Sequence, residues 1–128
     1  LQKFVPSDYT INTLALPYGS RPKDKTLEVY LQMGQYEDVS YENIAILNVG
    51  WMPALSPFHN AFDPLSIPRV RASDTDVDNV GFMNYLLDYE LNPQKRYISD
   101  GEASIITIPS SVADKLNTSL PLEIYSYE

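Results

Sequence analysis

The sequence predicts a mainly β fold, namely an antiparallel β-sandwich or jelly-roll-like barrel of about seven or eight strands. Three observations favour this class. Tyr and Pro each occur ten times. Gly and Pro separate segments of about five to nine residues, as in all-β domains with frequent turns. Two of these segments, 27–33 and 122–127, alternate apolar and polar residues as half-buried strands do.

Length and composition predict a single β-rich domain over residues 1–128. The chain is the size of one ordinary domain. Hydrophobic residues make up 44% and charged residues 20% of it, which is a globular balance. It has no cysteine, and a core of the expected size needs no disulfide framework.

The first third of the chain reads as an arm followed by strands. Residues 1–20 are expected to form an extended N-terminal arm, in which 10–16 suits a strand. The strand expected at 27–33 is the clearest in the chain, because its apolar residues recur at every second position. Residues 44–49 are apolar on both faces, which favours a central strand.

Residues 51–79 are predicted to form a long ordered loop. Four prolines, at 53, 57, 64 and 68, exclude a long helix or an interior strand. Only a short edge strand within 67–71 is compatible with them. The same stretch carries many large apolar residues, so we expect it to pack its own side chains. Loops of this length are often functional.

The last third alternates between strand and turn signals. Residues 82–91 match helical spacing, but their Tyr content favours a strand, with 96–99 as its partner. Asp100-Gly101 is a turn signal. We expect a strand at 103–108, a short helix at 111–117 after a start that resembles a capping box, and a last strand at 122–127.

One local resemblance concerns Ser104-Ile-Ile-Thr-Ile-Pro-Ser-Ser-Val-Ala-Asp-Lys-Leu116 and the strand that follows it. This stretch, about a fifth of the chain, resembles the strand–Pro–helix–strand element of AbrB-type swapped hairpins and double-psi barrels. Proteins of that type bind DNA through basic residues, whereas this element carries only Lys115. The resemblance therefore implies a local topology and no function.

The charge disfavours nucleic acid and membranes as partners. The formal net charge is −8, and the nine basic residues are scattered. Phosphate binding and anionic lipid surfaces both require clustered Lys and Arg. No apolar run reaches the roughly 20 residues that span a bilayer, so membrane insertion is not expected.

Asp74, Asp76 and Asp78 form the sharpest local feature. Alternating carboxylates in a loop can converge on Ca²⁺, which takes about six to eight oxygen ligands. The run begins like an EF-hand loop, but Asn79 and Tyr85 replace the Gly and Glu that such a loop requires. A solvated turn is favoured, and no cofactor is expected. The alternative, a loose Ca²⁺ site, predicts a higher melting temperature in Ca²⁺ than in EDTA.

The sequence disfavours an enzyme. His59 is the only histidine, which excludes the common multi-His zinc sites. There is no Gly-x-Ser-x-Gly elbow and no phosphate-binding Gly-rich loop. With seventeen acidic residues, no particular carboxylate pair stands out. We expect His59 to make a structural hydrogen bond; a small hydrolase that uses it as a base is the third hypothesis.

The leading hypothesis is a non-catalytic structural or interaction module that forms part of a larger assembly. A viral capsid or vertex protein, an appendage subunit or an accessory subunit would fit, in a virion or an extracellular setting. The expected partners are other protein subunits, in a homo- or hetero-oligomer. Aromatic residues suit such contacts because they offer apolar area at small entropy cost. The candidates are Trp51, Phe58, Phe62, Tyr30, Tyr125 and Tyr127.

The alternative hypothesis is a ligand-binding module for carbohydrate, or one stabilised by Ca²⁺. It would use the surface tyrosines and the Asp loop at 74–78.

Overall fold

The computed structural model describes residues 4, 6, 8–72, 81–93 and 101–128. It contains 26% helix and 29% strand, arranged in small separate sheets of two or three strands. The described residues form no closed barrel and no sandwich. The prediction of a mainly β sandwich or jelly roll is therefore wrong. Its premise was a continuous buried face along each strand, and most of the described strands have none.

The chain divides into two compact units. The first comprises Leu1–Gly50 and Asp63–Arg69, and the second comprises Trp51–Phe62 and Val70–Glu128. Each unit is described by itself below. The single domain expected from the sequence stays a prediction.

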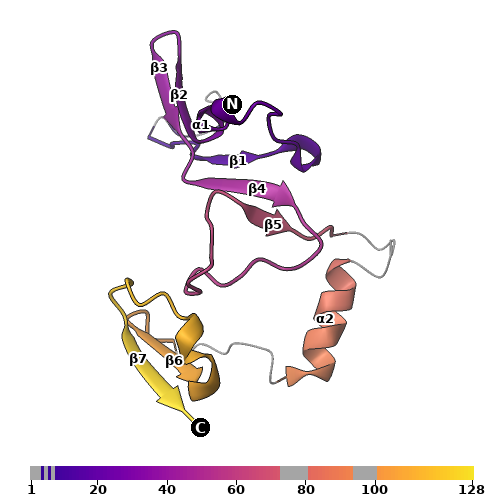
Figure 1. Ribbon diagram of the computed structural model, residues 1–128, viewed down its shortest axis with the longest axis vertical. Helices are drawn as coiled ribbons and strands as arrows, with labels where there is room; N and C mark the ends of the chain where they lie inside the picture. The colour runs from indigo at the N-terminus through magenta and orange to yellow at the C-terminus, as the bar shows by residue number, and fades with distance from the viewer. Residues whose placement is uncertain (1–3, 5, 7, 73–80, 94–100) are drawn as a thin grey trace. The chain divides into compact units, whose positions relative to one another are not determined.

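A parallel three-stranded sheet forms the centre of the first unit. Its order is β1 (Thr13–Ala15), β4 (Ala45–Val49), β5 (Ile67–Arg69), as Figure 1 shows. Ile46 in the central strand is only 2% exposed, and neighbouring strands pair with both edges of that strand. The strand expected at 44–49 and the short edge strand expected within 67–71 are confirmed.

Two arginines hold the connections around this sheet. Arg21 Nη2 donates to the Leu65 carbonyl at 2.6 Å. Arg69 donates from Nε to the Asn48 carbonyl and from Nη2 to the Leu16 carbonyl, each at 3.2 Å. A guanidinium offers several donors in a fixed plane, so one side chain can satisfy carbonyls from separate segments.

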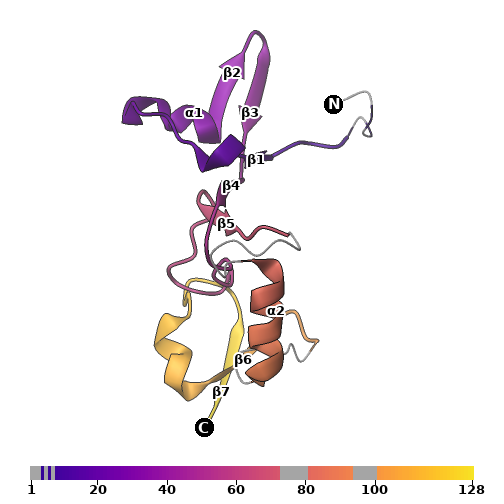
Figure 2. The ribbon, with the colours of Figure 1, turned by 90° about the vertical axis from the view of Figure 1, so that its right-hand side faces the viewer.

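The rest of the first unit is a short helical stretch and a hairpin. After η2 (Pro17–Gly19) come η3 (Lys25–Leu27) and α1 (Val29–Gln32). β2 (Met33–Tyr36) and β3 (Val39–Glu42) then pair antiparallel, and Figure 2 shows them as a two-stranded ribbon with α1 beside it.

The strand expected at 27–33 is wrong, since only its last residue lies in a strand. Local hydrogen bonds favour the helical turn instead: Asp24 Oδ1 accepts from the Thr26 N–H at 2.9 Å and from its hydroxyl at 2.7 Å. Lys25 and Glu28 pair at 2.8 Å across the same turn. Leu27 and Val29 are exposed, so no buried face enforces the alternation.

The second unit ends in a parallel strand pair. β6 (Ile105–Pro109) leads into the 3₁₀ helix η5 (Ser110–Lys115), and β7 (Glu123–Tyr127) returns alongside β6. Ile106 and Ile108 of β6 are buried. Both expected strands and the short helix are confirmed, and their order agrees with the strand–Pro–helix–strand topology that the resemblance implied.

Residues 82–91 form the helix α2 (Phe82–Leu91), so the expected strand is wrong. The segment contains no Gly or Pro, and it includes three Leu, one Met and one Glu, which are strong helix formers. These outweigh the β preference of Tyr85 and Tyr89. The expected partner strand at 96–99 lies outside the described residues. None of the described helices is both long and apolar enough to span a bilayer.

Between β4 and α2, the loop expected at 51–79 has little regular structure where it is described. Residues 51–66 form turns and an isolated bridge, and β5 follows. Residues 73–79 of this loop lie outside the described residues.

Candidate interaction surface

Exposed apolar side chains are the dominant surface feature. Among the described residues only four apolar side chains are buried, namely those of Leu16, Ile46, Ile106 and Ile108. By contrast, 24 large apolar or aromatic residues of the described chain are exposed. Scattered exposed apolar residues are normal, but so high a ratio of exposed to buried ones is not.

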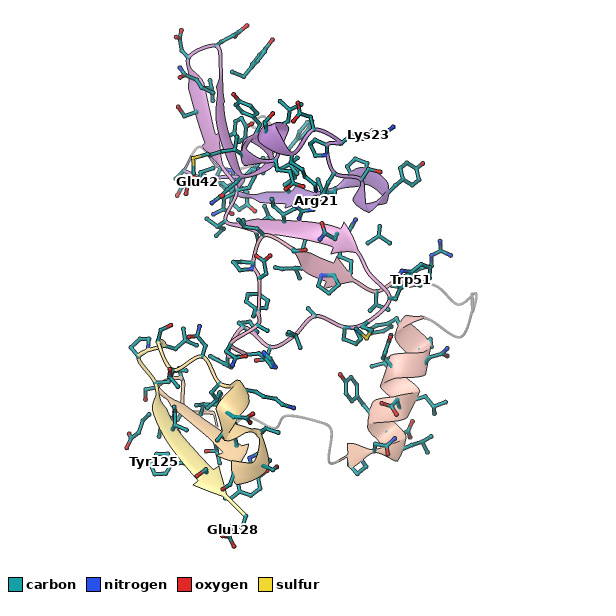
Figure 3. The ribbon with its side chains drawn as sticks, in the orientation of Figure 1. Arg21, Lys23, Glu42, Trp51, Tyr125 and Glu128 are labelled. Carbon is teal, nitrogen blue, oxygen red and sulfur yellow. The ribbon has the colours of Figure 1, made fainter. Side chains whose placement is uncertain are left out.

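Tyr125 and Tyr127 share one face of β7, and the structure brings this predicted pair together. All five residues of the strand are exposed, the two rings by 51% and 54%. Figure 3 shows Tyr125 projecting from the strand. Its hydroxyl donates to Glu123 Oε1 at 2.7 Å, which holds the ring upright on this face.

The other predicted aromatics lie in different settings. Trp51 is 67% exposed, and its carbonyl accepts a hydrogen bond from the Tyr85 hydroxyl. Phe58 and Phe62 are half-buried in the loop. Tyr30 belongs to the first unit and is exposed on α1, not on the strand that the sequence predicted.

A cavity of about 260 Å³ lies within the second unit. Its lining is mainly apolar and consists of Ser56, Phe58, His59, Ile106, Ile108, Val112, Lys115 and Leu116. The loop over it is tied down by two backbone hydrogen bonds of 2.8 Å, from Asn60 N to the Lys115 carbonyl and from Asn117 N to the Phe58 carbonyl.

The polar groups beside this cavity serve local turns. His59 Nδ1 accepts the Ala61 N–H at 3.0 Å, which places the proton of the neutral ring on Nε2. Ser56 Oγ accepts the Phe58 N–H at 3.2 Å. His59 therefore makes the structural hydrogen bond expected of it. An apolar side chain from a partner would suit the cavity.

The predicted metal ligands Asp74, Asp76 and Asp78 lie outside the described residues. Within the ranges that are described, no three His, Cys, Asp or Glu side chains gather closely enough to hold a metal ion.

Sequence reasoning missed the exposed apolar face of α2. Met83, Leu87 and Leu91 recur at intervals of four residues, and each is more than half exposed. This spacing places them on one helical face. The spacing was visible in the sequence, but the strand interpretation of 82–91 gave no reason to expect an exposed helical face.

We expect the substitution Glu123→Gln to lower the pKa of Tyr125. The hydrogen bond to the Glu123 carboxylate raises the Tyr125 pKa above its ordinary value of about 10, and partial desolvation adds to the effect. The raised pKa contributes stability that is present below pH about 10 and lost as the pH rises through the folded-state pKa. NMR titration of the tyrosine ring carbons measures this change. Glu128→Gln is the control, and an unchanged Tyr125 titration in Glu123→Gln would contradict the assignment.

The exposed side chains include many aromatic and aliphatic residues, and the central part of protein interfaces is richer in apolar area than the rest of a protein surface. No protein-family model, curated protein or solved structure gives a significant match to the chain.

Proposed function

We propose that the protein is a non-catalytic subunit of a larger protein assembly. The observation that supports this most is the imbalance between its four buried apolar residues and its 24 exposed ones in the described chain. A viral capsid or vertex protein, an appendage subunit and an accessory subunit of a complex are all assemblies of this kind.

Association with other subunits would bury part of this exposed apolar surface. Obligate interfaces bury about 2,000–5,000 Å² in total and resemble a protein core cut in half. Burial of apolar area contributes about 25 cal/mol per Å², so association can supply the stabilisation that so small a core lacks.

The net charge of −8 makes the association dependent on salt. Like-charged subunits repel each other, and salt screens this repulsion over about 8–10 Å at physiological ionic strength. Apolar contacts are not weakened by moderate salt. A homo-oligomer of this chain should therefore tighten as salt is raised.

Light scattering in solution tests the proposal. Over a roughly hundredfold range of protein concentration, we expect a mass of at least twice that of one chain, increasing with salt, and a melting temperature that rises with concentration. A monodisperse monomer with a melting temperature independent of concentration would overturn the proposal.

A further inference from the structure

β7 presents an open edge. Glu123 N donates to the Ser104 carbonyl at 2.9 Å, and Glu123 lies opposite Ile105 in the parallel register. Because backbone groups of a strand point alternately to its two sides, Tyr125 and Tyr127 also bond toward β6. The N–H and C=O groups of Ile124 and Ser126 then point away from β6, and they bond to nothing in the described part of the chain.

The opposite edge of the pair is closed. On β6, Pro109 has no N–H to donate, and the Ile105 N–H already bonds to the Glu102 carbonyl. Proline is a common protection of sheet edges. β7 contains no proline and no lysine, so the pair is protected on the β6 side and open on the β7 side.

The β6–β7 pair is also incomplete as a sheet. Parallel sheets are normally covered on both faces, and two-stranded ribbons are marginal by themselves. All five β7 residues are exposed. A further strand on the outer edge of β7 would complete the pair.

Charge and proline restrict which strand of a second copy can be added. A second β7 would bring the carboxylates of Glu123 and Glu128 together from both chains, and the β2–β3 hairpin is acidic at Glu37, Asp38 and Glu42. Like charges across a strand pair destabilise it. β5 carries Pro68 in its centre.

The edge formed by residues 9–15, here called the arm edge, lacks these obstacles. No residue from 9 to 20 is charged. Leu16 N donates to the Leu47 carbonyl at 3.0 Å, so by alternation Leu14 faces β4 while Ile11, Thr13 and Ala15 present their backbone groups to the outer side.

The side chains of the two edges also favour pairing between β7 and the arm edge. Tyr9 and Ile11 are exposed and belong to the string Tyr-Thr-Ile-Asn-Thr, which ends on the first residue of β1 and in which every residue except Asn12 favours strands. Ile124 of β7 is exposed too. Each chain therefore carries one open, uncharged edge and one open β7 edge.

We propose that β7 of one copy pairs with the arm edge of a second copy, so that subunits join head to tail by strand addition. This inference rests on the proposed function and specifies its interface. A contact between two different surfaces of the same chain produces a ring when the rotation closes and an open chain of subunits when it does not. Backbone hydrogen bonds supply the pairing, and side chains at alternate positions set the register.

The substitution Ser126→Pro tests this pairing, with Ser126→Ala as the matched control. Proline at Ser126 removes an outward N–H while leaving the β6–β7 bonds in place, because an edge strand tolerates proline on its solvent side. We expect Ser126→Pro to associate at least about tenfold more weakly than Ser126→Ala, with an unchanged circular dichroism spectrum. If the wild type assembles and Ser126→Pro assembles equally well, strand addition is wrong and the proposed function stands.

Cross-linking gives an independent test, since the chain has no cysteine of its own. Copies with Ile11→Cys are mixed with mass-tagged copies carrying Ile124→Cys and treated with a short bis-maleimide. We expect a higher yield of cross-linked mixed dimers from this pair than from a control in which Thr118→Cys, in the turn before β7, replaces Ile124→Cys. Equal yields with both partners would overturn the proposal, even if Ser126→Pro fails to fold.

Discussion

Replacing Ile46 by Ala is expected to destabilise the first unit by about 2–5 kcal/mol. Ile46 is 2% exposed at the centre of β4, and its N–H donates to the Pro64 carbonyl at 2.9 Å. Removing its side-chain carbons loses their transfer free energy and leaves a cavity against the face of β4. Leu16 is the other buried apolar residue described in this unit, so little packing remains to compensate.

Ile44→Ala is the matched control, because Ile44 lies two positions earlier in the chain and is 60% exposed. Its cost should stay below about 1 kcal/mol. Hydrogen exchange at the Leu16 amide, which bonds to the Leu47 carbonyl, reports on this sheet alone. Similar losses of protection in the two variants would contradict the view that β4 carries the core of this unit.

Two of the correctly predicted strands have a pattern that is supported both by burial and by a backbone constraint. β4 and β6 each contain a buried isoleucine flanked by a Gly or Pro stop, so the apolar run and the stop indicate the same strand. Residues 27–33 show the opposite case. Their alternation is as regular as that of 122–127, yet Asp24 and the Lys25–Glu28 pair favour a helical turn locally. Periodicity alone does not separate the two cases, because β7 forms a strand beside β6 although all five of its residues are exposed.

The exposure of several aromatic residues was predictable, but the position of the exposed apolar faces was not. Of the aromatic residues expected to contact partners, the exposed ones are Tyr30, Trp51, Tyr125 and Tyr127, and the contacts themselves stay a prediction. The apolar face of α2 was missed with the helix itself. The open edge of β7 depends on the parallel register of β6 and β7, which couples residues about 18 positions apart and has no local signature in the sequence.

The substitution Gly50→Ala should cost about 1–3 kcal/mol through crowding. Gly50 follows β4, and its N–H donates to the Arg69 carbonyl at 3.1 Å. A Cβ atom at this position would overlap the Pro68 Cβ and lie 3.0 Å from the Pro68 Cα. The proline ring is rigid, so β5 must move away from β4. That movement weakens the bonds from Arg69 to Asn48 and Leu16 as well.

Gly81→Ala separates this crowding from the general effect of replacing glycine. No atom lies within 4 Å of a Cβ built on Gly81, and its φ of −165° is an extended conformation that Ala adopts freely. The cost there should stay below about 1 kcal/mol, because only the N-cap preference of α2 changes. Urea unfolding of both variants gives the comparison. Because β5 approaches Gly50 closely, we expect Gly50→Ala to lower the urea midpoint more than Gly81→Ala does. Equal midpoints in the two variants would mean that β5 can shift without a loss of stability.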